Sequence, residues 1–251
     1  MSPIQTYIGM ETAHALSKKF GTNVTVGRVD LGLMNRIIID DVYLFDQSGK
    51  LMLKAARTSA KFDLLSLIHG KIQISSAQLF SFDLNLYKNS AKSKPNYQFV
   101  LDSLASKDTT SKSNLDLRIN SLIVRRGNIS YNKHYLPYTN GKFNLSHFNI
   151  RKFNAHVLLK ALGSDSINVN IKKMSLQEHS GLIINNMNFK FEANHKKCML
   201  SDMNIEMPST HIEIDTMSAT YKFAKGKIIP ATLQFYGGIH RSRITLKDFS
   251  C

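Results

Sequence analysis

The stretch Ile37-Ile38-Ile39-Asp40-Asp41-Val42-Tyr43-Leu44 decides the fold class. Ile37 and Ile39 form one pair with a spacing of two, and Val42 and Leu44 form another. Successive side chains of a β-strand point to opposite faces of the sheet, so this spacing predicts a half-buried strand. The same period recurs from Val24 to Leu86 and from Leu115 onwards, and turn signals such as Gln47-Ser48-Gly49 and His69-Gly70 separate the runs. The sequence therefore predicts a mostly β protein of about a dozen strands.

Two segments have helical spacing instead. The first covers residues 4–20, with Pro3 in its first turn, Lys18 and Lys19 in its last turn and Gly21 as its C-terminal stop. The second is short and contains Tyr97, Val100, Leu101 and Leu104, with Asn96 as the expected N-cap. It is flanked by polar, loop-like stretches, which indicates a linker that holds a small plug or cap helix.

These patterns divide the chain into four expected parts. They are a juxtamembrane amphipathic helix (1–21), a first β segment (22–88), a linker with a short helix (89–113) and a repetitive β segment (114–251). A weak repeat supports the last part, because His179, His195 and His211 are spaced by 16 residues, as are Met187 and Met203. We interpret this period as two short strands with two turns in a stacked meander.

Charge and composition restrict the partners. The 251 residues include 33 Lys and Arg against 18 Asp and Glu, a net charge of +15, and 43% are apolar, which is typical of a folded protein with a basic surface. The basic residues gather only in short groups, which we expect at strand ends and turns: Lys18-Lys19, Arg125-Arg126, Lys172-Lys173, Lys196-Lys197 and Arg241 with Arg243. We therefore expect a solvated or membrane-proximal surface and no nucleic-acid partner.

The sequence contains no spanning segment and no recognisable catalytic site. The longest unbroken apolar run is Val42 to Phe45, whereas a transmembrane helix needs about 20 residues. Cys198 and Cys251 have no zinc-site spacing, which indicates two free or buried thiols. Catalytic and phosphate-binding motifs are absent from the sequence, so we expect no enzyme, no cofactor and no metal.

Two groups of polar residues are the nearest candidates for chemistry. Asp40 and Asp41 are adjacent, so on a regular strand they would point to opposite faces and could not share a site. The three histidines could form a metal-binding ladder, but their polar neighbours are more typical of turns that face water. We interpret the aspartate pair as a solvated strand end and the histidines as turn residues that face water.

The functional hint is the amount of one-sided apolar sheet. An open curved sheet would leave its apolar face available to a ligand, and acyl chains suit such a face because they need no hydrogen bonds. A sixteen-carbon chain that crosses water would cost roughly 10 kcal/mol or more, which a continuous apolar track would largely remove. The expected lipid-groove residues are Val24, Val26, Leu44, Leu53, Phe62, Leu64, Ile72, Ile74, Phe82, Leu84, Leu86, Leu117, Ile119, Val169 and Ile171.

Several segments together resemble the AsmA/TamB-like family, in particular the N-terminal part of its Bacteroidetes-type members. The first is Leu16 to Val29, whose Val24-Thr25-Val26-Gly27-Arg28-Val29 is similar to the first strand of the family. The others are Ile38 to Asp46, Lys61 to Ile72, Asn96 to Leu104 and Met174 to Leu182, which resemble family strands, turns and a helix in the same order.

The resemblance implies a fold and a function. The implied fold is an elongated, curved antiparallel sheet that forms a taco-like open groove in the periplasm, anchored to the inner membrane by a helix that would precede this chain. The implied function is non-enzymatic transport of phospholipids between the inner and outer membranes of a Gram-negative cell during outer-membrane biogenesis. The transmembrane helix and the C-terminal domain of the family are missing, so we expect a fragment or a truncated gene product.

Alternatives to this conduit stay open. A closed β-sandwich or solenoid would instead be a structural or assembly module that supports insertion of outer-membrane proteins, of the autotransporter type, with an Omp85-type barrel. It would act by strand addition at an exposed edge. The shape of the sheet, open or closed, discriminates between these hypotheses.

Overall fold

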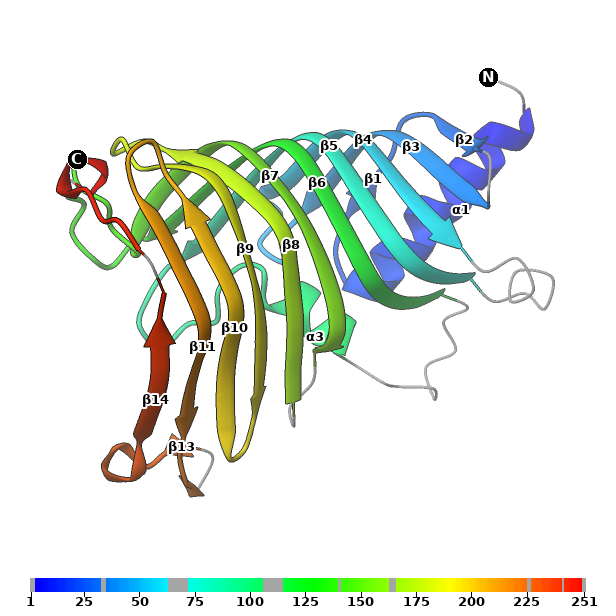
Figure 1. Ribbon diagram of the computed structural model, residues 1–251. Helices are drawn as coiled ribbons and strands as arrows, with labels where there is room; N and C mark the ends of the chain where they lie inside the picture. The colour runs from blue at the N-terminus through cyan, green and yellow to red at the C-terminus, as the bar shows by residue number, and fades with distance from the viewer. Residues whose placement is uncertain are drawn as a thin grey trace.

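The computed structural model describes residues 3–32, 35–62, 72–105, 115–139, 141–162, 166–224, 227–240 and 242–249. One long curved sheet of 12 strands dominates it, with a helix at the N-terminus and a short helix in the middle of the chain (Figure 1). The sheet is open, because its strand order runs from β1 to β14 without closing. The expected mostly β class with an open curved sheet and two helices is confirmed.

The helices are α1 (Pro3–Phe20) and α3 (Gln98–Ala105). The sheet order is β1-β3-β4-β5-β6-β7-β8-β9-β10-β11-β14, and β2 pairs with β3 outside this path. The strands of the sheet are β1 (Val24–Thr25), β2 (Val29–Gly32), β3 (Arg36–Phe45), β4 (Leu51–Phe62), β5 (Ile72–Lys88), β6 (Leu115–Lys133), β7 (His147–Leu162), β8 (Ser166–Glu178), β9 (Ile183–Asn194), β10 (Lys197–Glu206), β11 (His211–Thr220) and β14 (Gln234–Ile239). A separate two-stranded sheet pairs β12 (Phe223–Ala224) with β13 (Lys227–Ile228), and short 3-10 helices cover Pro230–Thr232 and Leu246–Asp248.

One pair of neighbours departs from the expected antiparallel sheet. β5 and β6 run parallel along a long register that includes Phe82 opposite Gly127. Parallel neighbours need a connection that carries the chain back along the sheet, and the linker with α3 provides it. The two β segments expected from the sequence therefore form one continuous sheet.

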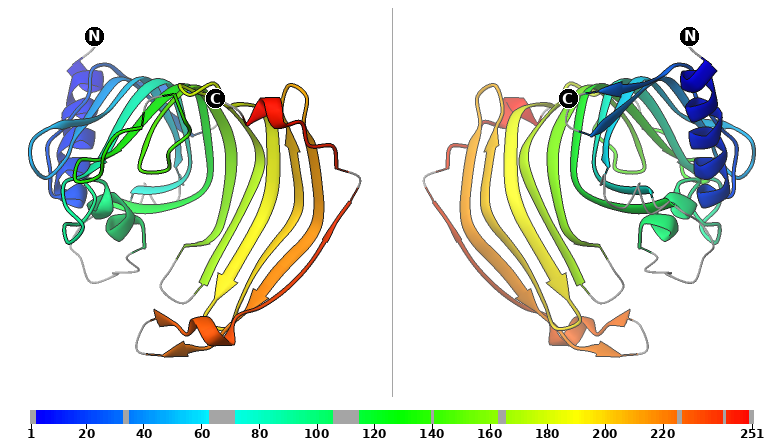
Figure 2. Two further views of the ribbon diagram at one scale, coloured as in Figure 1. Left: turned by 90° about the vertical axis from the view of Figure 1, so that its left-hand side faces the viewer. Right: turned by 90° about the vertical axis from the view of Figure 1, so that its right-hand side faces the viewer.

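The helices cover one end of the concave side of the sheet. Phe99 of α3 is buried with Val24 and Leu44, and Phe20 of α1 packs beside it, with the two rings edge to face at 6.2 Å. Figure 2 shows the strands curving around α3, and α1 beside the first strands. The expected helix 4–20 and its stop at Gly21 (φ 64°) are confirmed, as is the short helix of the linker.

Pairs of consecutive outward residues interrupt the alternation in the middle of most strands. We call each such pair a step. On β3, Ile39 and Val42 both belong to the buried cluster, so Asp40 and Asp41 between them both lie on the other face. The register places comparable steps on neighbouring strands. The second residue of several steps has a left-handed backbone with φ between 51° and 55°: Asp41, Ser81, Arg126, Lys152 and Asp202. Such β-bulges bend a strand and shift its alternation by one residue.

The steps keep one face apolar along the whole sheet. We call the face that carries Val42 and Phe82 the inner face, which is concave, and the opposite face the outer face, which is convex (Figures 1 and 2). Between β2 and β7 the inner face is a packed core whose buried members are Val29, Ile39, Val42, Ala55, Phe82, Val124 and Ala155.

Two hairpins share a turn built on an acidic residue. In Asp46-Gln47-Ser48-Gly49, the Asp46 carboxylate accepts hydrogen bonds from the N–H groups of Ser48 (2.9 Å) and Lys50 (3.0 Å) and from the Tyr87 hydroxyl (2.6 Å). In Glu178-His179-Ser180-Gly181, the Glu178 carboxylate accepts from the Ser180 N–H at 2.6 Å. Burial raises the pKa of Asp46, but its hydrogen bonds from Tyr87, Ser48 and Lys50 outweigh that effect, so its pKa lies below the ordinary value.

Three sequence predictions were wrong in detail. The alternation expected from Leu115 onwards fails at Phe143 and Leu145, which are exposed in the connection between β6 and β7. The Asn96 side chain bonds to β5, accepting from the Tyr87 N–H (2.9 Å) and donating to the Asn85 carbonyl (3.0 Å), instead of capping α3. The 16-residue period contains one strand and one turn, because each strand from β8 to β11 is longer than expected.

We predict that Gly127→Ala destabilises the protein by roughly 2 kcal/mol or more, because the new Cβ would overlap the ring of Phe82. Urea denaturation measures the loss. The double variant Gly127→Ala/Phe82→Leu should lose less stability than the sum of the two single losses, because the leucine side chain lacks the ring atoms that would overlap the new Cβ. Additive losses in the double variant would contradict this packing.

We predict that Asp46→Asn lowers the free energy of unfolding at pH 7 by roughly 2 kcal/mol, because the buried carboxylate loses charge-assisted hydrogen bonds. The folded-state pKa of Asp46 is depressed, so its contribution is present above the ordinary Asp pKa of about 3.9 and is lost as the pH falls through the folded-state value. The difference from wild type should therefore shrink in acid, as measured by denaturation at several pH values. Asp83→Asn, at an exposed position on β5, is the control.

Candidate functional site

From β8 onwards none of the described elements forms a second layer over the inner face. Every inward position on β9, β10, β11 and β14 is apolar or glycine, and within the described residues α1 and α3 reach only the other end of the sheet. We call this region the uncovered inner face. Its members are Ile167, Val169, Ile171, Met174, Leu176, Ile184, Met187, Phe189, Phe191, Ala193, Cys198, Leu200, Met203, Ile205, Ile212, Ile214, Met217, Ala219, Phe235 and Ile239.

Exposure varies across this face and is highest on the edge strand β14, whereas Leu176 on β8 and Ile214 and Ala219 on β11 are buried. Val169 and Ile171 on β8 are half-buried, whereas Met217 is 40% exposed, and Ile239 and Phe235 on the edge strand are 69% and 73% exposed. Side chains of this size normally fill a core or meet a partner. The uncovered inner face is therefore a contiguous apolar surface over several strands that a ligand could contact.

The structure divides the expected lipid-groove residues into three groups. Val24, Leu44 and Phe82 are buried in the packed core or under α3, so a ligand could not reach them without displacing neighbours. Val26, Leu53, Leu84 and Leu86 are half-buried and pack against the same clusters. Only Val169 and Ile171 belong to the uncovered inner face.

The structure does not assign the remaining expected lipid-groove residues to the packed core or to the uncovered inner face. Ile119 is half-buried and lies where the register between β5 and β6 shifts. Leu64 lies outside the described residues, as do the side chains of Phe62, Ile72, Ile74 and Leu117. Sequence reasoning missed the inward residues of β9 to β14, although the alternation of Met187, Phe189 and Phe191 could have revealed them.

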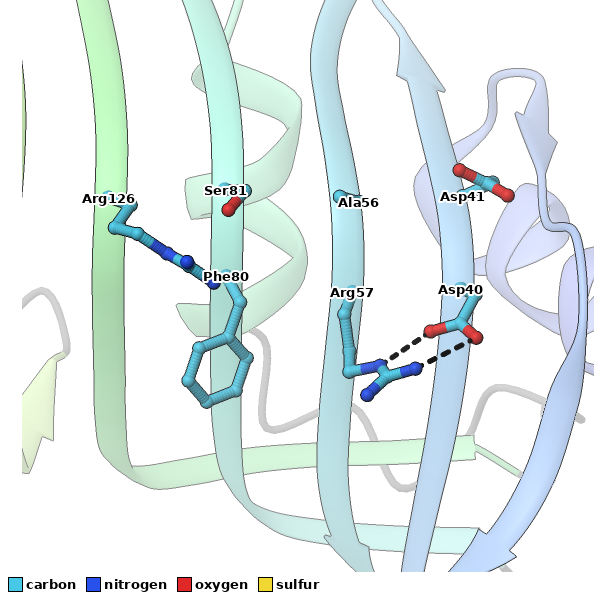
Figure 3. A pocket seen from close by; sticks show the side chains of 7 residues that line it. All are labelled: Asp40, Asp41, Ala56, Arg57, Phe80, Ser81 and Arg126. Atoms are coloured by element: carbon cyan, nitrogen blue, oxygen red, sulfur yellow. Dashed lines mark hydrogen bonds and ion pairs between the residues drawn. The ribbon is translucent and has the colours of Figure 1, made fainter.

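The outer face has a shallow hollow of about 490 Å³ in the middle of β3 to β6 (Figure 3). Asp40 and Asp41 both line it, together with Arg57 and Arg126. The expectation that the two carboxylates point to opposite faces at a strand end was therefore wrong, because the bulge at Asp41 lies in mid-strand and turns both outward. Hydrogen bonds and charge from Arg57, then from Arg28, hold the pKa of Asp40 below its ordinary value, so Asp40 is an ion-pair partner and not a proton donor at neutral pH.

The histidines of the repeat do not come together. His179 follows β8 and His211 begins β11 at one end of the sheet, whereas His195 lies in the turn between β9 and β10 at the other end. Within the described residues, no cluster of His, Cys, Asp and Glu could hold a metal ion. Cys198 is a free, half-buried thiol on the inner face of β10, and Cys251 lies outside the described residues.

Two of the basic groups are not where we expected them. Arg125-Arg126 and Lys172-Lys173 occupy mid-strand steps of β6 and β8, so they lie on the outer face and not at strand ends or turns. Lys18-Lys19 ends α1 and Lys196-Lys197 lies at a turn, as expected, whereas Arg241 lies outside the described residues.

Neither family nor curated sequence comparisons identify relatives: no family model matches the chain, and no curated protein matches it. None of the described helices combines the length and the apolar character needed to cross a bilayer. The geometry alone therefore supports a function, and what it offers is a surface for apolar contact with acyl chains or a partner strand.

Proposed function

We propose that this chain is a non-enzymatic lipid-binding protein that holds phospholipid acyl chains on its uncovered inner face. The single observation that carries the proposal is the continuous set of inward apolar side chains from Ile167 on β8 to Ile239 on β14, most of which are half-buried or exposed. Each methylene that such a face keeps from water is worth about 0.8 kcal/mol, so a surface several strands wide can hold a whole acyl chain.

The arrangement suits passage along the face as well as binding. Its inward positions are aliphatic, aromatic or thioether groups and the thiol of Cys198, which attract acyl chains chiefly without directional bonds. Sliding from one strand to the next therefore breaks no hydrogen bond. In the setting that the AsmA/TamB-like resemblance implies, the chain would carry phospholipids through the periplasm between an inner-membrane anchor and the outer membrane.

The packed core limits the part of the sheet to which lipid could bind. Phe82 is 3% exposed and α3 lies over Leu44 and Leu53, so lipid would bind from β8 onwards and would meet α3 as a plug at the other end. Passage over the whole sheet would require α1 and α3 to move.

We predict that Met217→Asp and Phe235→Asp each lower the affinity for a fluorescent fatty acid by roughly tenfold or more, because a carboxylate on the acyl-binding face must stay hydrated. Both positions are exposed, so the sheet should stay folded by circular dichroism. Thr216→Asp and Tyr236→Asp, one residue away on the outer face, are matched controls and should bind as wild type does. Equal losses in controls and inner-face variants would refute the proposal.

A second candidate function is assembly by strand addition, which the edge strand β14 favours. β14 ends the strand order, and all of its residues are exposed. Unpaired backbone groups along such an edge can accept another strand, for example from an Omp85-type barrel.

This alternative predicts site-specific cross-links between a photoreactive residue at Ile239 and a β-strand of an outer-membrane barrel, and no such links from Ile167, which is far from the edge. Mass spectrometry of the cross-linked product would identify the partner strand. Lipid cross-links at both positions, without any barrel peptide, would favour the conduit.

A further inference from the structure

The outer face of β6, β7 and β8 carries a dense group of cations that the steps bring together. Each strand contributes two consecutive basic residues that the bulge turns outward, and all six side chains are exposed. We call this group the outer basic patch. It consists of Arg125, Arg126, Arg151, Lys152, Lys172 and Lys173.

Asn154 marks the centre of the outer basic patch. Its side-chain oxygen accepts from the Arg126 N–H at 3.0 Å, and its side-chain nitrogen donates to the Ser175 hydroxyl at 3.3 Å, so it joins the outer faces of all three strands. Arg151 lies opposite Gln177, and Lys173 lies opposite His156, on either side of this centre. From strand spacing and rise, the six cations cover roughly 10 Å by 17 Å.

No carboxylate neutralises the patch within the described part of the chain. The ion pairs of the outer face lie on either side of it, between Arg57 and Asp40 and between Lys190 and Asp202 at 2.6 Å. On β5 the outward carboxylate of Asp83 accepts a hydrogen bond from the Asn128 side chain at 2.8 Å, and outward residues nearer the centre of the patch, such as Asn149 and Gln177, are neutral. Like charges so close together repel one another, so an anionic partner would be bound favourably.

We infer that the outer basic patch binds the anionic phospholipid headgroups of a membrane surface. The patch lies on the convex face of the sheet, opposite the side that α1 and α3 cover, so no described helix lies between it and a flat, negatively charged surface (Figure 2). Single-stranded nucleic acids are bound by a series of stacking aromatic side chains, whereas the middle of these three strands has no outward Phe or Tyr and only Phe80 of the neighbouring β5 lies beside Arg126. Basic clusters next to anionic lipids gain affinity with each Lys or Arg.

This inference does not depend on the proposed function. The uncovered inner face would contact acyl chains, whereas the outer basic patch would contact headgroups from the opposite side of the sheet. Headgroup binding would depend on salt and on lipid charge, and acyl binding would depend on neither.

The test is co-sedimentation of the full chain with vesicles. Wild type should bind vesicles of phosphatidylglycerol and phosphatidylcholine at about 0.1 M salt, and should be released at about 1 M salt. The double variant Lys172→Glu/Lys173→Glu should lose about 30-fold in affinity. The matched control Lys196→Glu/Lys197→Glu makes the same change in net charge at the turn between β9 and β10 and should lose less than threefold.

Further variants keep the result interpretable. Lys172→Arg/Lys173→Arg should bind as wild type does, because only charge is needed, and Met217→Asp should retain salt-sensitive vesicle binding. Equal losses of vesicle affinity in the two Glu variants would mean that net charge alone, and not the patch, determines binding. That result would overturn the inference. Binding of pure phosphatidylcholine vesicles as tightly as anionic ones, or patch-dependent binding of an oligonucleotide without vesicle binding, would overturn it as well.

Discussion

A sheet only one layer thick must keep its apolar side chains on the same face in every strand, and this constraint governs the whole structure. A regular strand changes face at every residue, so any bend or extra residue would turn the following apolar residues towards water. The steps at Asp40-Asp41, Arg125-Arg126 and Lys172-Lys173 solve this problem, because each places two polar residues outward where the phase of the alternation changes. Bending and face selection therefore depend on the same pairs.

Much of the fold could be predicted from the sequence because alternation is a local signal. The two helices, the strand-rich character and the open curved sheet all followed from spacing and turn residues. The steps were also visible, as charged pairs between apolar residues in Ile39 to Val42 and Ile171 to Met174. Alternation alone indicates strand ends at these pairs, because a regular strand has no place for two consecutive outward residues. In the structure each strand continues through the pair, and only the phase of its alternation changes.

The rest depends on contacts between distant segments. The parallel pairing of β5 with β6 requires the linker to carry the chain back along the length of β5, and no local sequence pattern encodes this path. Burial of Phe82 depends on the absence of a side chain at Gly127 of the neighbouring strand. The candidate site was similarly misplaced: alternation identifies inward residues, but only tertiary packing decides that Leu44 lies under α3 while Val169 stays uncovered.

The same constraint links the two surfaces for which we propose partners. An apolar side chain within a step lies on the outer face, as Ala56 on β4 and Phe80 on β5 do, so contact with water requires polar residues in most steps. That requirement is met equally by Asn185-Asn186 on β9, which is neutral, and by Asp215-Thr216 on β11. Polarity alone therefore does not explain why β6, β7 and β8 all use two cations. Neighbouring strands with alternating charge would have been more stable, as the pair of Arg57 with Asp40 illustrates. The accumulation of one charge on three adjacent strands is the feature that folding does not require, and an anionic surface outside the chain gives it a physical reason.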